Sequence, residues 1–147
     1  MTDFADSRFA IIAADFYADL AERLTAGARA CLTEAGVELI DEFRVPGAFE
    51  LPLAARQVAL SLNYVGIICV GAVIRGETDH YDFVCSESAR GILNVGLETG
   101  VPCGFGVLTV DSMEQAISRS GGDRRDSGRH AAEAVLAQLA ITDRLYS

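Results

Sequence analysis

The chain has 147 residues, half of them hydrophobic, which is enough for one ordinary domain with a core of real size. Twelve basic residues stand against 21 acidic ones, and the formal net charge of −9 has the wrong sign for general binding to nucleic acids or anionic membranes. Any anion that the protein binds must therefore be held by a local site.

The amino-terminal segment, MTDFADSRF, lacks the basic stretch and the following apolar stretch of a secretion signal. No apolar run further along approaches the ~20 residues that span a bilayer. We therefore expect a cytoplasmic protein without a membrane or nucleic-acid partner, folded as a single domain over residues 1–147.

The first half of the chain alternates between strand and helix patterns. Residues 8–14 form an apolar run that predicts a strand, and apolar side chains then recur at helical spacing over 16–35 until Gly36 stops them. A second strand is expected at about 37–45. A helix at 48–62 follows the Pro-Gly pair that ends this strand.

The second half continues the alternation. Residues 65–74 are a continuous apolar run, which is typical of a strand buried on both faces. A helix is expected at 79–99, closed by Gly100 and Pro102 in the usual order. The stretch 103–110 predicts a fourth strand.

A short helix and a long one complete the chain. The sequence from Ser112 to Gln115 fits a capping box, in which the serine and glutamine side chains satisfy the first free amides of a helix. A polar stretch at 120–128 leads to a last helix at about 129–143. We expect His130 to act as a capping residue there.

These patterns predict an α/β protein, a three-layer α/β/α sandwich with a flavodoxin-like open sheet of four parallel strands and helices on both faces. The connections between successive strands are long enough for parallel pairing. The helix at 79–99 has apolar side chains on more than one side, and we expect part of this surface to pack against another subunit.

Two features of the composition limit the chemistry. The cysteines are scattered singly in apolar stretches without a C-x-x-C pair, so we interpret Cys31, Cys69, Cys85 and Cys103 as reduced core thiols. We expect no metal site. The chain contains no lysine, so the amine for any imine chemistry must belong to a substrate.

Ligands of an open parallel sheet bind outside the carboxyl ends of its strands, and this rule selects Phe16, the stretch 47–50 and the stretch 75–80. The third offers glycine, threonine and a helix start, whose backbone amides and positive dipole end suit an anion. His80 lies beside this anion site. It is a candidate general acid and base, although a capping or surface histidine also fits the local pattern.

Four residues admit two interpretations each. Glu50 could accept hydrogen bonds from a polyol, or its carboxylate could interact with the positive end of the dipole of the helix that it starts. Phe16 and Phe105 could stack on a flat heterocycle or belong to the core. Arg119 could bind phosphate or complement a helix carboxyl end. The glycine-rich fingerprint of dinucleotide binding is missing after the first strand.

Four segments in order resemble the lumazine synthase family over nearly the whole chain: VPGAFELP at 45–52, GAVIRGETDHYDFV at 71–84, FGVLT at 105–109 and EQAISRSG at 114–121. GAVIRGET followed closely by histidine is the most specific of them. The resemblance implies an enzyme of riboflavin biosynthesis that needs no cofactor. It would condense 5-amino-6-(D-ribitylamino)uracil with 3,4-dihydroxy-2-butanone 4-phosphate to 6,7-dimethyl-8-ribityllumazine, phosphate and water.

The resemblance also implies a role for each candidate residue. The proton-transfer histidine falls on His80, and the phosphate contacts fall on Glu77 and Thr78, mainly through backbone amides, and on Arg119. In the family the site lies between subunits of a homopentamer, which in some members assembles further, and Phe105 and Arg119 would come from the neighbour. The pocket for the ring and the ribityl chain falls on Phe16, Ala48, Phe49, Glu50, Ala72, Val73, Ile74 and Phe105.

The chain departs from the family pattern at three places. It has Asp15-Phe16-Tyr17 where the family usually has arginine-phenylalanine-asparagine. It has Asp126-Ser127-Gly128 and then His130 where the family often has asparagine-lysine-glycine and then glutamate. Only about seven residues precede the first strand, where many members have an extra strand that pairs with the adjacent subunit. The candidates to replace the lost lysine are Arg124, Arg125 and Arg129.

Two other functions stay open from the sequence. One is a lumazine-binding or flavin-binding paralogue with little turnover, which the missing lysine favours. The other is an unrelated flavodoxin-like signalling or nucleotide-binding domain, which would be a monomer.

Overall fold

The computed structural model describes residues 3–122 and 125–146. Across these residues, none of the helices combines the length and the apolarity that crossing a membrane requires. The elements in chain order are β1 (Arg8–Ala14), α1 (Ala18–Glu34), β2 (Leu39–Val45), the 3-10 helix η1 (Ala48–Glu50), α2 (Leu51–Leu60), β3 (Gly66–Ile74), α3 (His80–Thr99), β4 (Cys103–Val110), α4 (Met113–Ser118) and α5 (Ser127–Tyr146).

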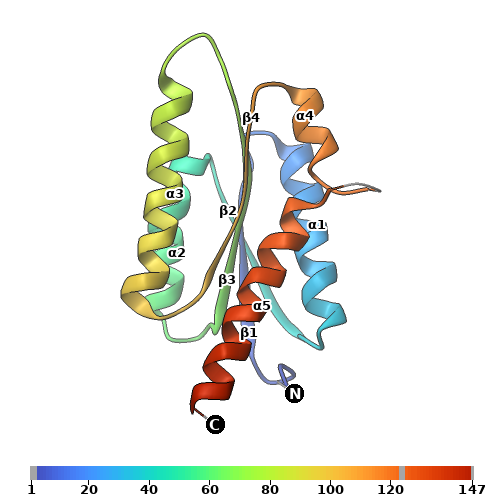
Figure 1. Cartoon of the computed structure of the whole chain (residues 1–147), viewed down its shortest axis with the longest axis vertical. Coiled ribbons are helices and arrows are strands. Elements are labelled where there is room, and N and C mark those ends of the chain that lie inside the picture. The colour runs from blue at the N-terminus through green and yellow to red at the C-terminus, as the bar shows by residue number, and fades with distance from the viewer. Residues whose placement is uncertain (1–2, 123–124, 147) are drawn as a thin grey trace.

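The four strands form one parallel sheet in the order β2-β1-β3-β4, which confirms the predicted flavodoxin-like α/β class. β1 lies between β2 and β3, with Ala10 opposite Asp41 on one side and Ile67 on the other. β3 pairs with β4 as far as Ile74, opposite Val110. The carboxyl ends of the strands therefore meet at one edge of the sheet, at the top of Figure 1.

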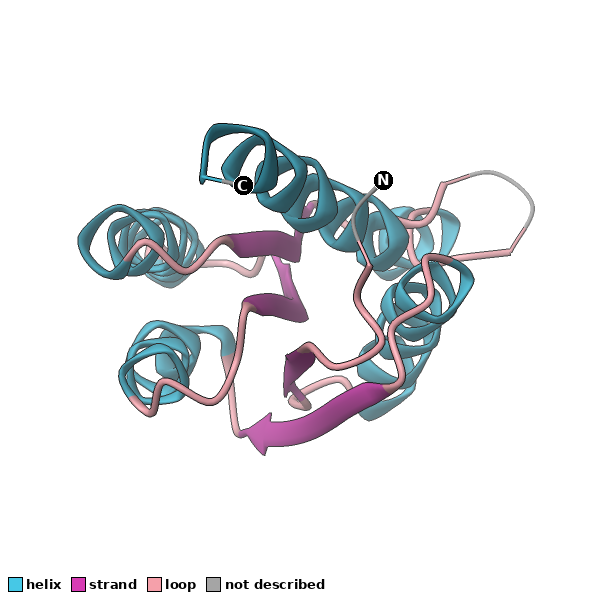
Figure 2. Ribbon diagram, turned by 90° about the horizontal axis from the view of Figure 1, so that it is seen from below, coloured by secondary structure: helices cyan, strands magenta, loops and turns pink. Residues whose placement is uncertain are grey.

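Helices cover both faces of the sheet and produce three layers (Figures 1 and 2). α2 and α3 lie on one face, whereas α1, α4 and α5 lie on the other. Each face has its own cluster of buried apolar side chains. β1 and β3 are buried along nearly their whole length, as the continuous apolar runs predict.

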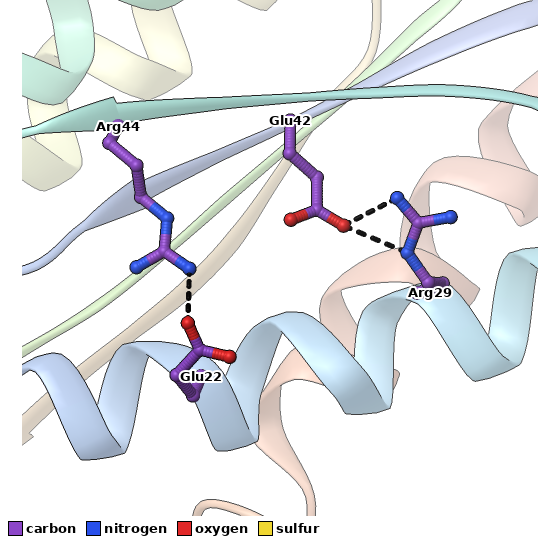
Figure 3. A network of polar contacts seen from close by, with 4 residues as sticks. All are labelled: Glu22, Arg29, Glu42 and Arg44. Carbon is purple, nitrogen blue, oxygen red and sulfur yellow. Dashed lines mark hydrogen bonds and ion pairs between the residues drawn. The ribbon is translucent and has the colours of Figure 1, made fainter.

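β2 forms one edge of the sheet, and its residues are half-buried or exposed. Two ion pairs connect it to α1: Arg29 with Glu42, and Arg44 with Glu22 (Figure 3). The Arg29 guanidinium donates from two nitrogens to one carboxylate oxygen of Glu42. Ion pairs of this exposure contribute about 1 kcal/mol or less, so they align the edge strand more than they stabilise it.

Most boundaries agree with the sequence patterns to within a few residues. α1 begins at Ala18, slightly later than expected, because the two aromatic residues before it belong to the turn after β1. A turn of 3-10 helix precedes α2. At α4 the Ser112 hydroxyl accepts a hydrogen bond from the backbone amide of Gln115 at 3.2 Å, as the capping box predicts. The Gln115 side chain accepts a hydrogen bond from the backbone amide of Asp111, at 2.7 Å, and not from that of Ser112.

The start of α5 differs from the prediction. The helix begins at Ser127, and the Asp126 carboxylate accepts the Arg129 amide at 3.0 Å. Asp126 is thus the capping residue, as carboxylates commonly are at this position. The expectation that His130 caps α5 is wrong, because His130 lies inside the helix and the cap is the Asp126 carboxylate that precedes it.

Two glycines bring α1 and α5 into close contact. A Cβ added at Gly128 would collide with the carbonyl oxygen of Leu24. A Cβ at Gly27 would collide with the Asp126 carboxylate, which caps α5. The contact between these helices is therefore made partly by backbone, and its closeness depends on the missing side chains.

Replacing Gly128 with alanine should lower the free energy of unfolding by about 1–3 kcal/mol, the usual cost of overpacking, because a backbone carbonyl cannot move aside as a side chain can. Urea unfolding followed by circular dichroism measures the change. Gly76→Ala is the matched control, since no atom lies within 4 Å of a Cβ at that position. Equal unfolding midpoints for Gly128→Ala and the wild type would contradict the close contact.

Candidate functional site

A cavity of about 630 Å³ opens at the carboxyl edge of the sheet, where ligands bind in folds of this type. Its walls come from the turn after β1, from η1, from the end of β3 and from the first turn of α3. Its volume lies in the range of small-molecule sites. The lining residues are Phe16, Tyr17, Gly47, Ala48, Phe49, Glu50, Ala72, Val73, Ile74, His80, Phe83 and Val84.

The cavity brings together most of the site residues that the sequence predicts, whereas four of them do not line it. Glu77 and Thr78 lie in the loop directly before α3. Phe105 lies on β4 with 43% of its surface exposed. Arg119 follows α4, and its guanidinium donates to the Gln115 carbonyl at 3.2 Å. The predicted residues that share the cavity are Phe16, Ala48, Phe49, Glu50, Ala72, Val73, Ile74 and His80.

Small side chains and exposed aromatic rings shape this cavity. Ala48 and Ala72 are buried and leave room above the sheet. Phe16, Phe49 and Phe83 are 75%, 59% and 66% exposed, so their rings are accessible to a ligand. Aromatic rings stack favourably on other flat rings in offset arrangements. The cavity therefore fits a planar heterocycle.

Glu50 provides the carboxylate of the cavity. Its amide donates to the Gly47 carbonyl at 3.2 Å, which closes the turn of η1. A Cβ at Gly47 would lie 3.3 Å from Glu50 Oε1, so the glycine gives the carboxylate room. The exposed carboxylate has several lone pairs and can accept hydrogen bonds from the hydroxyls of a polyol.

His80 is the first residue of α3 and lies exposed at the cavity wall. Its backbone amide donates to the Thr78 hydroxyl at 3.3 Å. α3 has 20 residues, and the positive end of its dipole lies at this point, which suits an anion. An imidazole here can exchange protons with a ligand whose anionic group lies at the helix start.

The cysteines provide no activated thiol. All four are free, as expected, but only Cys31 and Cys69 are buried in the core, whereas Cys85 and Cys103 are half-buried. Burial raises the pKa of Cys85, on α3, and raises that of Cys103 to about 11, so both are protonated near neutral pH and unsuited to nucleophilic attack. Among the residues that the structure describes, no group of three or more His, Cys, Asp or Glu is placed to hold a metal ion.

The arginines considered as replacements for lysine differ in their environment. Arg129 donates to both carboxylate oxygens of Glu34, at 3.0 and 2.6 Å, and this pairing raises the pKa of its guanidinium. It connects α5 to α1. Arg125 is exposed, and Arg124 lies outside the described residues. The positive charge of Arg129 is therefore already paired with the Glu34 carboxylate, and not with a ligand.

Three lining residues were not predicted, Tyr17, Phe83 and Val84, whereas Gly47 belongs to the stretch 47–50 that the strand-end rule selects. The helical period could have identified two of them, because Phe83 and Val84 follow His80 by three and four residues and so lie on the same side of α3. Tyr17 adjoins the predicted Phe16 in the turn after β1. Its position depends on how this turn bends, which spacing alone does not determine.

Comparisons with known proteins identify close relatives. Residues 6–143 match the family model described as 6,7-dimethyl-8-ribityllumazine synthase. A protein of this name from Nitratidesulfovibrio vulgaris is 46% identical over 140 residues, which cover 94% of this chain and 90% of the relative. The protein so named from Kineococcus radiotolerans is 48% identical, with 93% and 84% covered, and that from Deinococcus radiodurans is 44% identical, with 95% and 90% covered.

Proposed function

This chain belongs to the 6,7-dimethyl-8-ribityllumazine synthase family, and from that membership we propose that its cavity is the site of the condensation in riboflavin biosynthesis. The amine of 5-amino-6-(D-ribitylamino)uracil attacks the ketone of 3,4-dihydroxy-2-butanone 4-phosphate to form an imine, with loss of one water. Phosphate leaves by elimination, and the ribityl-bearing nitrogen closes the second ring with loss of a second water. The observation that carries the proposal is that one cavity collects the predicted ring, ribityl and proton-transfer residues.

The pyrimidine ring and its ribityl chain take the part of the cavity between β1 and β3. Phe16 stacks on the ring, and the Glu50 carboxylate accepts hydrogen bonds from the ribityl hydroxyls, together with the backbone around Ala48 and Phe49. The stretch from Ala72 to Ile74 lines the other side. The exposure of the Phe16 ring and the room beside Glu50 support these roles.

The phosphate substrate takes the part of the cavity next to α3. Backbone amides at Glu77 and Thr78 hold its phosphate at the positive end of the helix dipole, and His80 moves the protons of imine formation and elimination. Because the chain has no lysine, the imine forms between the two substrates and not on the protein. Holding both substrates in register supplies much of the remaining acceleration.

The complete site is formed between subunits of a homopentamer, in which a neighbour contributes Phe105 and Arg119. Neither residue lines the cavity of its own chain. Exposed apolar side chains on α3, β4 and α5 support such an assembly, because surfaces of this kind mark protein contacts. They are Phe83, Leu93, Leu97, Phe105, Ile141 and Leu145.

A second candidate is a paralogue that binds lumazine or flavin with little turnover. It is favoured by the missing lysine and by the engagement of Arg129 with Glu34. Family membership excludes the unrelated signalling or nucleotide-binding domain. The free thiols agree with the cytoplasmic location that we propose for the enzyme.

Incubating the protein with both substrates should yield the fluorescent lumazine, and His80→Ala should lower kcat by about 10²–10⁴-fold, the usual contribution of a general acid and base. His130→Ala, which changes the other histidine, is the control and should stay within about 3-fold of the wild type. Wild-type protein of the correct assembly that binds lumazine but releases no product would favour the paralogue.

Phe16→Ala should weaken binding of the lumazine product about 10-fold, because stacking on one aromatic ring contributes about 1–3 kcal/mol. Fluorescence titration gives the Kd. The matched control is Phe43→Ala, which removes an exposed ring on β2, away from the cavity lining. Equal Kd values for the two variants would remove Phe16 from the ring site.

Multi-angle light scattering should give a mass of at least five times the 15.6 kDa chain. The exposed apolar side chains on α3 and α5 would then be covered by neighbours. A monomeric mass at micromolar concentration would contradict both the pentamer and the shared site.

A further inference from the structure

A five-residue loop, residues 75–79, joins β3 to α3 and carries the proposed phosphate contacts. All of its residues, and His80 after it, are exposed. Burial in the core therefore does not hold the loop in place. If its amides and the His80 imidazole are to bind and protonate one substrate, they must keep their positions relative to the strand ends. Polar contacts are then needed to hold them there.

The side chain of Arg75 makes contacts that reach two neighbouring elements. Its Nε donates to Asp111 Oδ1, just beyond β4, at 2.9 Å. Its guanidinium lies 4.3 Å above the centre of the Tyr81 ring and 3.8 Å from the Asp82 carboxylate, both in the first turn of α3. The backbone amide of Arg75 also donates to the Val110 carbonyl at 2.8 Å. One planar side chain thus connects the loop, the end of β4 and the start of α3.

Tyr81 lies where this connection reaches the sheet. Burial raises the pKa of its hydroxyl, which has Cys85 on the same helix and Thr109 on β4 as polar neighbours. The ring under the guanidinium therefore lies beside the edge strand. A planar cation that stacks and donates at the same time is a property of arginine that lysine does not share.

The charge of Arg75 also matters for an anionic ligand. Asp82 and Asp111 lie close to the loop, and unpaired carboxylates there would repel a phosphate dianion. The single positive charge of the guanidinium offsets one of these two negative charges, and the hydrogen bond to Asp111 raises the pKa of the guanidinium. One residue thus both fixes the loop and reduces the repulsion.

We propose that Arg75 is the positioning residue of the phosphate half of the site, which sets the loop amides and His80 by fixing the start of α3 to the end of β4. The proposal rests on the proposed function and assigns Arg75 no contact with substrate. Loss of the side chain should therefore impair the phosphate substrate selectively and leave the ring substrate nearly unaffected.

The test compares Arg75→Gln and Arg75→Lys with Arg56→Gln. Arg56 pairs with Glu98 between α2 and α3, outside the cavity, and its side chain is 49% exposed, as is that of Arg75. For Arg75→Gln we expect kcat/KM for the butanone phosphate to fall about 10–100-fold, as small misplacements do. KM for the ribitylamino-pyrimidine should change less than about 3-fold, and Arg75→Lys should recover only part of the loss.

Hydrogen exchange gives a readout that does not depend on turnover. Amides of residues 76–82 should exchange faster in Arg75→Gln than in the wild type and in Arg56→Gln. The inference is overturned if Arg75→Gln matches Arg56→Gln in exchange and in kcat/KM, or if both substrates lose affinity equally. Turnover by the wild type tests the proposed function separately. If Arg75→Gln does not fold, the comparison is made with Arg75→Lys instead.

Discussion

Parallel pairing places the carboxyl ends of all four strands at one edge of the sheet, and the site depends on this arrangement. Each strand that ends there must turn into a helix on one of the two faces. The turns after β1, β2 and β3 then surround a cavity. Helix starts meet strand ends at the same edge, so apolar walls and a positive dipole end occur together. A planar ring and a phosphate require that combination.

The site also has to accept a phosphate within a chain of net charge −9. Ion pairs keep several carboxylates matched locally, including those of Glu34 with Arg129 and of Asp111 with Arg75. Backbone amides carry no compensating negative charge and remain available to an anion. The acidic composition therefore sets the behaviour of the surface at long range, whereas the phosphate binding that we propose depends on a few contacts within one loop.

The sequence patterns predicted the fold because β1 and β3 are central strands whose residues must be apolar on both faces. Their bounds agree closely with the continuous apolar runs. Helix starts were less predictable, since the cap of α5 depends on the Asp126 carboxylate and not on the nearby histidine. The strand-end rule identified Phe16, Glu50 and His80 without any relative. Phe105 and Arg119 were chosen from the family resemblance alone, and their part in the site stays a prediction because neither lines the cavity.

The close contact of α1 and α5 has a consequence for how the molecule moves. A backbone carbonyl against a glycine leaves no side chain that could change rotamer to let the helices slide. These two helices are therefore held at a fixed distance from each other. The turns that line the cavity do not take part in this contact, so they can adjust to a ligand while α1 and α5 stay in place.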